Sequence, residues 1–279
     1  MDQNVKPDLP AWKMPTGISS LDPVMDGGIP PGSLVLLLGE IGAGTSEFIY
    51  SSLLSVALKK QAPKSSNGIV LPSIIRYITI TKMSEDIKRE MALSFHADLL
   101  AGRDEIQFED LSQVYFDASV VPVDWYSKGD IRSRLKNRTT KDTLSELANT
   151  LERDGENNLV VLDSLTDLAS QYANSPRRGD LLAFMRGLQR ITKQWNTTVY
   201  MPLTTAILKP ADEQELADIA DAVILFRWEE SQGSRRQRVM YFEKFRGLMP
   251  HLEEKDLVKF SVKISSAIGF EVSNIRVII

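Results

Sequence analysis

The sequence predicts an α/β fold, namely a doubly wound, mainly parallel sheet flanked by helices. Apolar, β-rich runs alternate with segments of helical periodicity along most of the chain, which is the order expected of successive strand–helix–strand units. The last apolar runs follow one another without a helical segment between them. They predict an antiparallel hairpin at the C-terminal edge of the sheet.

The elements follow from these patterns in chain order. The apolar run 34–38 is the first strand, and Ile49, Leu53 and Val56 recur on one face of a helix over about 46–59. The later elements are a strand at 74–80, a helix from Ser84, a short strand at 113–116, a helix at 143–153, a strand at 158–163, a helix around 181–191, and strands at 198–203, 222–226, 239–242, 258–264 and 270–272. Residues 14–279 are expected to form a single domain after an irregular, proline-containing arm at 1–13.

Composition limits the possible functions. The formal net charge is -4, so nucleic acid could be bound only by a local basic patch, and nucleic acid is not an expected partner. The absence of cysteine excludes disulfides and thiolate chemistry, and it suits a reducing compartment. The sequence shows no leader peptide and no apolar run of about 18 residues, so a cytoplasmic protein without a membrane span is expected.

A glycine-rich loop at 39–46 carries the strongest chemical signal. It lies between the first strand and the first helix and follows the pattern G-x-x-x-x-G-K-[ST], whose backbone N–H groups hold phosphate oxygens. Thr45 stands where the pattern has its lysine, whereas Ser46 keeps the hydroxyl that binds Mg²⁺. The expected nucleotide-binding residues of the loop are Gly39, Gly42, Ala43, Gly44, Thr45 and Ser46.

A second signal is the carboxylate of Asp163, which ends the most apolar run of the chain. In phosphate-loop proteins, an acidic residue at the end of a neighbouring buried strand holds the water shell of Mg²⁺. Ser46 and Asp163 are therefore the expected magnesium ligands if nucleotide binds. The alternative is that Asp163 caps the helix that follows the strand.

Several motifs in a fixed order give the chain its family resemblance. They are Thr16-Gly17-Ile18, Leu21-Asp22, Gly27-Gly28-Ile29-Pro30, Gly32-Ser33, the loop itself, Tyr77-Ile78-Thr79-Ile80, Ser84-Glu85-Asp86-Ile87, Val160-Val161-Leu162-Asp163, Glu215-Leu216-Ala217-Asp218 and Lys244-Phe245-Arg246-Gly247. The set resembles the KaiC-like branch of the RecA superfamily over roughly residues 14–272. The resemblance implies a RecA-like ATPase core that often assembles into hexameric rings, with nucleotide bound between neighbouring subunits.

One departure from this family concerns catalysis. The family's second strand usually ends in two glutamates, one of which orients the attacking water, whereas this chain has Thr81 and Lys82 there. Loss of a general base alone typically costs about 10²–10⁴-fold in rate. Because the loop lysine is also missing, ordinary ATP turnover is not expected.

Nucleotide binding is a separate matter from turnover. Our hypothesis is that Lys82 substitutes in space for the missing lysine of the loop. The reason is that positions 45 and 82 both depart from the family pattern in this chain. The alternative is a solvated lysine in a decayed site. The resemblance also implies that Lys244 and Arg246 reach the phosphates of a neighbouring subunit; alternatively, they are basic residues on an exposed turn.

Two other groups of residues give weaker evidence of a functional site. Arg235, Arg236 and Arg238 could bind phosphate, but no aromatic platform is expected beside them, so a solvated turn is favoured. His96 and His251 cannot form a zinc cluster without cysteines.

Two functions remain open. The first is a non-catalytic KaiC-like protein that binds ATP and Mg²⁺ weakly or not at all and acts as a regulatory or scaffolding partner, for instance in signal transduction. The second is an active ATPase of the same superfamily that assists DNA repair or recombination. In either case the expected partners are further copies of the chain or a related subunit.

Overall fold

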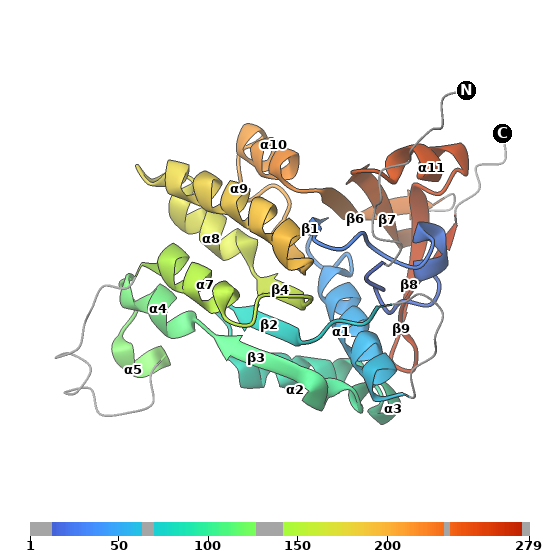
Figure 1. Ribbon diagram of the computed structural model, residues 1–279, viewed down its shortest axis with the longest axis horizontal. Coiled ribbons are helices and arrows are strands. Elements are labelled where there is room, and N and C mark those ends of the chain that lie inside the picture. Colours follow the sequence, from blue (N-terminus) through green and yellow to red (C-terminus); the bar gives the residue numbers. More distant parts are fainter. Residues whose placement is uncertain (1–12, 63–69, 127–141, 232–234, 275–279) are drawn as a thin grey trace, which may run out of the picture.

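The described part of the chain forms a nine-stranded sheet with helices on both faces (Figure 1). The computed structural model describes residues 13–62, 70–126, 142–231 and 235–274. The strands are β1 (Leu34–Gly39), β2 (Ile75–Thr79), β3 (Ile106–Asp110), β4 (Leu159–Asp163), β5 (Thr198–Thr204), β6 (Ala222–Ser231), β7 (Arg235–Phe245), β8 (Lys259–Ser265) and β9 (Gly269–Asn274). Their order in the sheet is β3-β2-β4-β5-β1-β6-β7-β8-β9.

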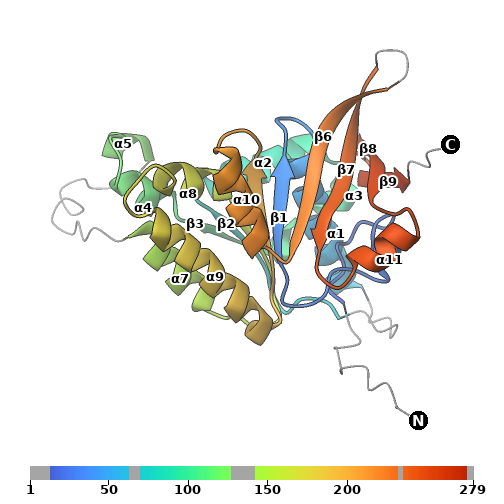
Figure 2. The same cartoon turned by 90° about the horizontal axis from the view of Figure 1, so that it is seen from above.

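The sheet divides into a parallel part and an antiparallel part. All the pairings between neighbouring strands from β3 to β6 are parallel, whereas β6 to β9 pair antiparallel. This arrangement confirms the predicted RecA-like, mainly parallel sheet with an antiparallel C-terminal edge. β6 and β7 form a long hairpin that extends beyond the carboxyl edge of the parallel strands (Figure 2).

Helices cover both faces of the parallel strands. α1 (Thr45–Gln61), α2 (Ser84–Ser94) and α3 (Ala97–Leu100) pack on one face, and α7 (Thr143–Glu152), α8 (Leu165–Tyr172), α9 (Arg178–Trp195) and α10 (Pro210–Ile219) pack on the other (Figures 1 and 2). The remaining helices are α4 (Ser112–Asp117), α5 (Val123–Tyr126) and α11 (Met249–Glu254), with 3₁₀ turns at Asp22–Met25 and Arg103–Glu105. No helix in the described ranges is long and apolar enough to cross a membrane.

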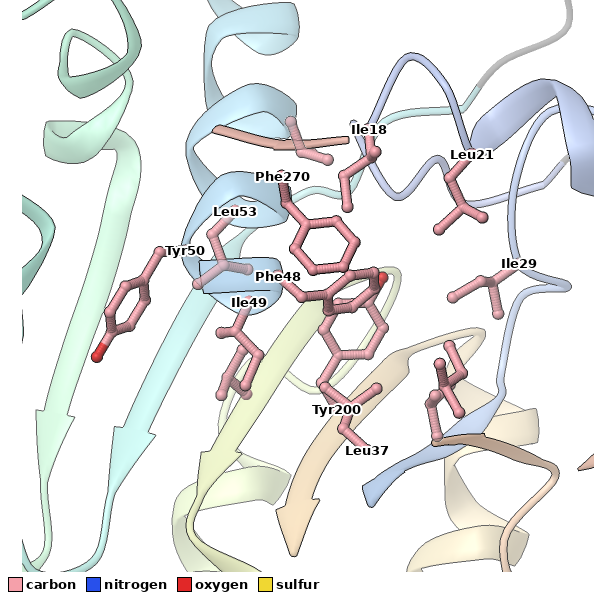
Figure 3. Close-up of a cluster of buried hydrophobic side chains, with 14 of the residues drawn as sticks. Ile18, Leu21, Ile29, Leu37, Phe48, Ile49, Tyr50, Leu53, Tyr200 and Phe270 are labelled. Carbon is pink, nitrogen blue, oxygen red and sulfur yellow. The ribbon is translucent and has the colours of Figure 1, made fainter. Parts of the chain in front are cut away.

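Phe48 anchors the first turn of α1 in the core (Figure 3). Its ring centroid lies 5.3 Å from that of Phe226 and 5.3 Å from that of Phe270, to which it is nearly perpendicular at 86°. Burial of such a side chain stabilises the fold by roughly 1.5–3 kcal/mol. The helix that follows the glycine-rich loop is therefore fixed against both the parallel strands and the C-terminal hairpin.

Two expectations about elements are corrected. The strand predicted at 113–116 is wrong, because Ser112–Asp117 is a helix and the strand lies earlier, at Ile106–Asp110. The Asp110 carboxylate accepts a hydrogen bond from the backbone N–H of Ser112 at 2.8 Å, which turns the chain into that helix. β7 also begins at Arg235, so the arginines belong to the strand rather than to a turn before it. Residues 1–12 of the predicted arm lie outside the described residues.

Candidate functional site

The carboxyl ends of the parallel strands bring the predicted chemical groups together. Gly39 at the end of β1 begins the glycine-rich loop, and Thr79 of β2 is aligned with Asp163 of β4. A pocket of about 470 Å³ opens at this edge. Of the predicted residues, those that line it are Gly39, Gly42, Gly44, Thr45, Ser46, Lys82 and Asp163. Open α/β sheets bind ligands at this edge.

The loop leaves backbone donors at the start of α1. The helix begins at Thr45 after Gly44, which has φ 110° and no side chain that could cap the first turn. The first N–H groups of a helix have no partner within the helix, and they attract anions together with the positive end of the helix dipole. Ala43 is fully buried and does not line the pocket, so it serves the loop's packing.

Thr45 does not replace the missing lysine. Its hydroxyl is buried and has no hydrogen-bond partner among the residues that the structure describes. A Cβ added to Gly39 would lie 2.1 Å from Thr45 Oγ1, so the hydroxyl packs directly over Gly39. The side chain thus turns back toward the end of β1, and the loop supplies no cation of its own.

Lys82 lies beside Asp163. Its Nζ is 3.4 Å from Asp163 Oδ2 and 4.0 Å from Glu90 Oε2 of α2. The Tyr77 hydroxyl donates a hydrogen bond to the same Oδ2 at 2.7 Å from the buried side. Burial, and then the Asp163 charge, raise the pKa of Tyr77 well above its ordinary value, so the phenol remains a neutral donor. Asp163 Oδ2 therefore contacts both a neutral hydroxyl and an ammonium.

Tyr50 of α1 extends this cluster toward α2. Its hydroxyl donates to Glu90 Oε2 at 2.6 Å, and its ring centroid lies 6.3 Å from that of Tyr77. Burial and the Glu90 carboxylate raise the pKa of Tyr50. The Lys82 ammonium consequently stands between two carboxylates, each of which also accepts a tyrosine hydroxyl.

Asp167 is a pocket residue that the sequence reasoning missed. Its Oδ2 accepts hydrogen bonds from Ser164 Oγ at 2.5 Å and from Thr81 Oγ1 at 3.3 Å. Ser164 is the N-cap of α8 and accepts from the Asp167 backbone N–H. The signal was present as the capping pattern S-x-x-D after the Asp163 strand. Asp167 is thus a carboxylate near Thr81 whose contacts are those of a helix cap.

The β6–β7 hairpin contributes a second missed feature. The guanidinium groups of Arg236 and Arg238 lie 4.3 and 4.5 Å from the ring centroid of Trp228. Trp228 Nε1 donates to the Ile41 carbonyl at 3.2 Å, and Arg238 Nε donates to the Gly42 carbonyl at 3.0 Å. The expectation that no aromatic ring accompanies these arginines is wrong, because Trp228 is the cross-strand partner of Arg238.

Lys244 and Arg246 lie at the opposite edge of the sheet, since Lys244 is aligned with Val223 near the start of β6. Lys244 Nζ donates to the Ala217 and Asp218 carbonyls at 3.0 and 2.6 Å, at the end of α10. Burial, and then Arg246, lower the pKa of Lys244. The structure does not bring these two cations to the pocket of their own chain.

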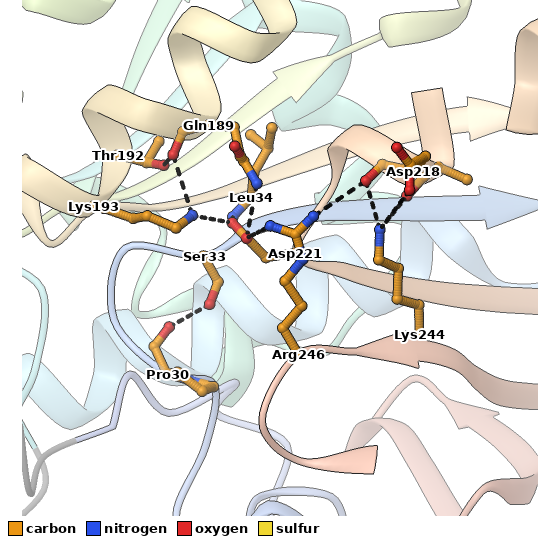
Figure 4. A network of polar contacts seen from close by, with 11 residues as sticks. Pro30, Ser33, Leu34, Gln189, Thr192, Lys193, Asp218, Asp221, Lys244 and Arg246 are labelled. Atoms are coloured by element: carbon orange, nitrogen blue, oxygen red, sulfur yellow. Dashed lines mark hydrogen bonds and ion pairs between the residues drawn. The ribbon is translucent and has the colours of Figure 1, made fainter. Parts of the chain in front are cut away.

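Arg246 belongs to a polar network around Asp221 (Figure 4). Its Nη1 donates to Asp221 Oδ1 at 3.1 Å, and Lys193 Nζ donates to Asp221 Oδ2 at 2.7 Å. The backbone N–H of Leu34 donates to the same Oδ2 at 3.0 Å. Asp221 therefore ties the start of β1 to α9 and to the end of β7.

Comparisons with known proteins agree with this fold. The family model described as "ATPase: KaiC" matches residues 14–263. A KaiC-like protein of the hyperthermophilic archaeon Pyrococcus horikoshii has a similar structure, with a TM-score of 0.58 and 17% identity over 94% of this chain and 98% of that chain. The flagellar accessory protein FlaH of Methanocaldococcus jannaschii is similar with a TM-score of 0.56 and 15% identity, over 92% of this chain and 96% of that chain.

No curated protein matches the sequence. The family model spans most of the chain, and the two solved structures named above share the fold over at least 92% of the chain. The chain belongs to the KaiC ATPase family.

Proposed function

We propose that the chain binds a nucleoside polyphosphate at the loop pocket without turning it over, and that it acts as a regulatory or scaffolding protein. The observation that carries the proposal is Lys82. Its ammonium lies 3.4 Å from Asp163, in the place where the family resemblance implies a glutamate that orients water. Phosphoryl transfer depends on positioning and charge stabilisation, so a cation at this place supports phosphate binding but cannot activate water.

The pocket keeps the donors that hold phosphate. The uncapped first turn of α1 and the loop at Gly42 and Gly44 offer N–H groups whatever residue stands at position 45. Lys82 is 41% exposed, so its ammonium is accessible from the pocket that it lines. These groups favour a polyanion at the carboxyl edge of the sheet.

The β6–β7 hairpin supports the choice of a nucleotide over a simple phosphate. Trp228 is half-buried against the loop and is flanked by Arg236 and Arg238. Bases stack on aromatic side chains and on guanidinium planes, at about 1–3 kcal/mol per base. Because this cluster contacts the loop at Ile41 and Gly42, a base could stack there while its phosphates reach the start of α1.

A regulatory or scaffolding role requires a partner for the chain. Members of the family are often oligomeric and generally bind ATP with Mg²⁺. A bound nucleotide that is not consumed stabilises whichever state it binds, so it can hold a contact between subunits. We propose that the partner is a second copy of this chain or a related subunit.

A gain-of-function series tests the absence of turnover. The variant Thr45→Lys/Thr81→Glu/Lys82→Glu restores the loop lysine and the glutamate pair, and the matched control Thr45→Lys/Thr81→Gln/Lys82→Gln lacks a base. Phosphate release from ATP should be undetectable in the wild type and at least about 10²-fold faster in the glutamate variant than in its control. Both variants are first checked for a wild-type thermal unfolding profile.

The variant Asp167→Asn tests the opposite possibility, that the protein hydrolyses ATP. If the wild type releases phosphate and Asp167→Asn abolishes that release, then Asp167 is the base and the protein is an active ATPase. The proposal of a non-catalytic protein would then be wrong.

A further inference from the structure

The residues at Asp163 fit Mg²⁺ poorly. Magnesium requires near-octahedral oxygen ligands at about 2.0–2.1 Å, and its usual protein ligands are one or two carboxylates beside the phosphates. Ser46 and Asp163 are the residues expected to hold it here. Among the described residues, no group of three or more histidines or carboxylates is placed to hold a metal ion. Asp163 is the carboxylate of the expected pair, so whether Mg²⁺ fits depends on the surroundings of Asp163.

One oxygen of Asp163, Oδ2, already has two partners. Oδ2 accepts the Tyr77 hydroxyl from the interior at 2.7 Å and faces Lys82 Nζ at 3.4 Å on the pocket side. The Asp163 side chain is 12% exposed, so few other directions of approach remain. A divalent cation bound here would stand beside the Lys82 ammonium, and these like charges repel each other.

Lys82 is held in this position from a second side. Glu90 Oε2 lies 4.0 Å from its Nζ, and Tyr50 fixes that carboxylate through a 2.6 Å hydrogen bond. The ammonium thus stands between an acidic residue of β4 and one of α2, and Lys82 lines the loop pocket. A lysine placed in this way offers a fixed positive charge to a polyanion in the pocket.

We propose that the Lys82 ammonium takes the place of magnesium beside Asp163, so that the pocket binds a nucleoside polyphosphate without a divalent cation. The inference rests on the proposed nucleotide binding and specifies its cofactor requirement. It departs from the family, whose members generally bind ATP with Mg²⁺. It also gives one physical reason for two departures from the family pattern, namely the loss of the lysine at position 45 and the gain of a lysine at position 82.

Calorimetric titration with ATP tests this, once in excess EDTA and once in excess Mg²⁺. The wild type should bind with indistinguishable affinity in both buffers. Lys82→Met should lose at least about tenfold in affinity in EDTA, because a charge-assisted contact is removed, and should regain it in Mg²⁺ as the metal binds the freed Asp163. Lys88→Met is the matched control, since Lys88 lies on α2, pairs with Glu85 at 2.7 Å and does not line the loop pocket.

The outcomes separate the two proposals. Wild-type binding in Mg²⁺ but not in EDTA overturns the metal-free site and leaves nucleotide binding intact. Wild-type affinity of Lys82→Met in EDTA also overturns it, provided that Lys88→Met behaves as the wild type. Absence of binding in both buffers refutes the proposed function itself.

Discussion

The guanidinium of Arg238 lies 4.5 Å from the centre of the Trp228 ring, and both side chains also donate hydrogen bonds to the glycine-rich loop. Arg236 lies over the same ring at 4.3 Å. The antiparallel register of β6 and β7 produces this cluster, because Trp228 and Arg238 are cross-strand partners. This hairpin, in the antiparallel part of the sheet, thereby contacts the glycine-rich loop directly.

Replacement of the ring should separate base binding from phosphate binding. Trp228→Leu is expected to weaken ATP binding by about 1–3 kcal/mol, which is the stacking contribution of one base, and to change tripolyphosphate binding much less. Calorimetric titration with each ligand measures both effects. Tyr241→Leu is the matched control, because Tyr241 lies on the same hairpin but packs against the hydrophobic cluster on the sheet face that α7 to α10 cover, with Lys259 over its ring. Equal losses for ATP and tripolyphosphate would show that Trp228 only supports the loop.

Asp221 should contribute strongly to stability. It is 7% exposed and accepts from Leu34, Lys193 and Arg246, so Asp221→Asn removes the negative charge that pairs with the two cations and one of the two acceptor oxygens. We expect the free energy of unfolding to fall by about 1–3 kcal/mol in urea denaturation. Asp218→Asn should change it by less than about 0.5 kcal/mol, because the Asp218 side chain is 91% exposed. Equal effects of the two substitutions would argue against the network around Asp221.

The link between α7 and α9 should depend on pH. Arg177 and then Ser145 lower the pKa of Asp142 to about 2, and Asp142 caps α7. A carboxyl whose pKa is depressed in the folded state binds its proton first in the unfolded state. The stability it contributes is therefore present above its unfolded pKa of 3.8 and is lost as the pH falls toward 2.

Urea denaturation at several pH values between about 5 and 2.5 measures this dependence. Asp142→Asn should be less stable than the wild type at the upper end, and the difference should shrink toward the lower end. A difference that stays constant across this range would show that the Arg177 contact does not set the acid response.

Association of subunits should depend on nucleotide. If Lys244 reaches the phosphates of a neighbouring copy, saturating ATP should shift the wild type to a larger species in size-exclusion chromatography. Lys244→Met should bind ATP as the wild type does but show no shift, since Lys244 lies far from the pocket of its own chain. An unchanged elution of the wild type with ATP would leave Lys244 with its observed role at the end of α10.

The fold could be predicted because local patterns determine it. The apolar runs ending at Gly39 and Asp163 are buried parallel strands, and their shared edge follows from the alternation with helices. The same reasoning placed Lys82 at this edge. The helix at Ser112–Asp117 was missed because its residues Val114, Tyr115 and Phe116 have high β-propensity, and the turn set by Asp110 overrides it.

The rest of the site depends on tertiary register. Trp228 and Arg238 are ten residues apart, and only the pairing of β6 with β7 brings them together beside the loop. Tyr77 is an ordinary strand residue in the sequence, and its bond to Asp163 requires the parallel alignment of β2 with β4. Neither relationship has a sequence spacing that would predict it.

Binding of ATP without hydrolysis can be tested in one sample by calorimetric titration of the wild type, with phosphate release followed at the same time. We expect saturable binding and no phosphate above the buffer blank. Phosphate release that grows with protein concentration would show that the protein is an active ATPase, and absence of binding at millimolar ATP would make the glycine-rich loop a structural turn only.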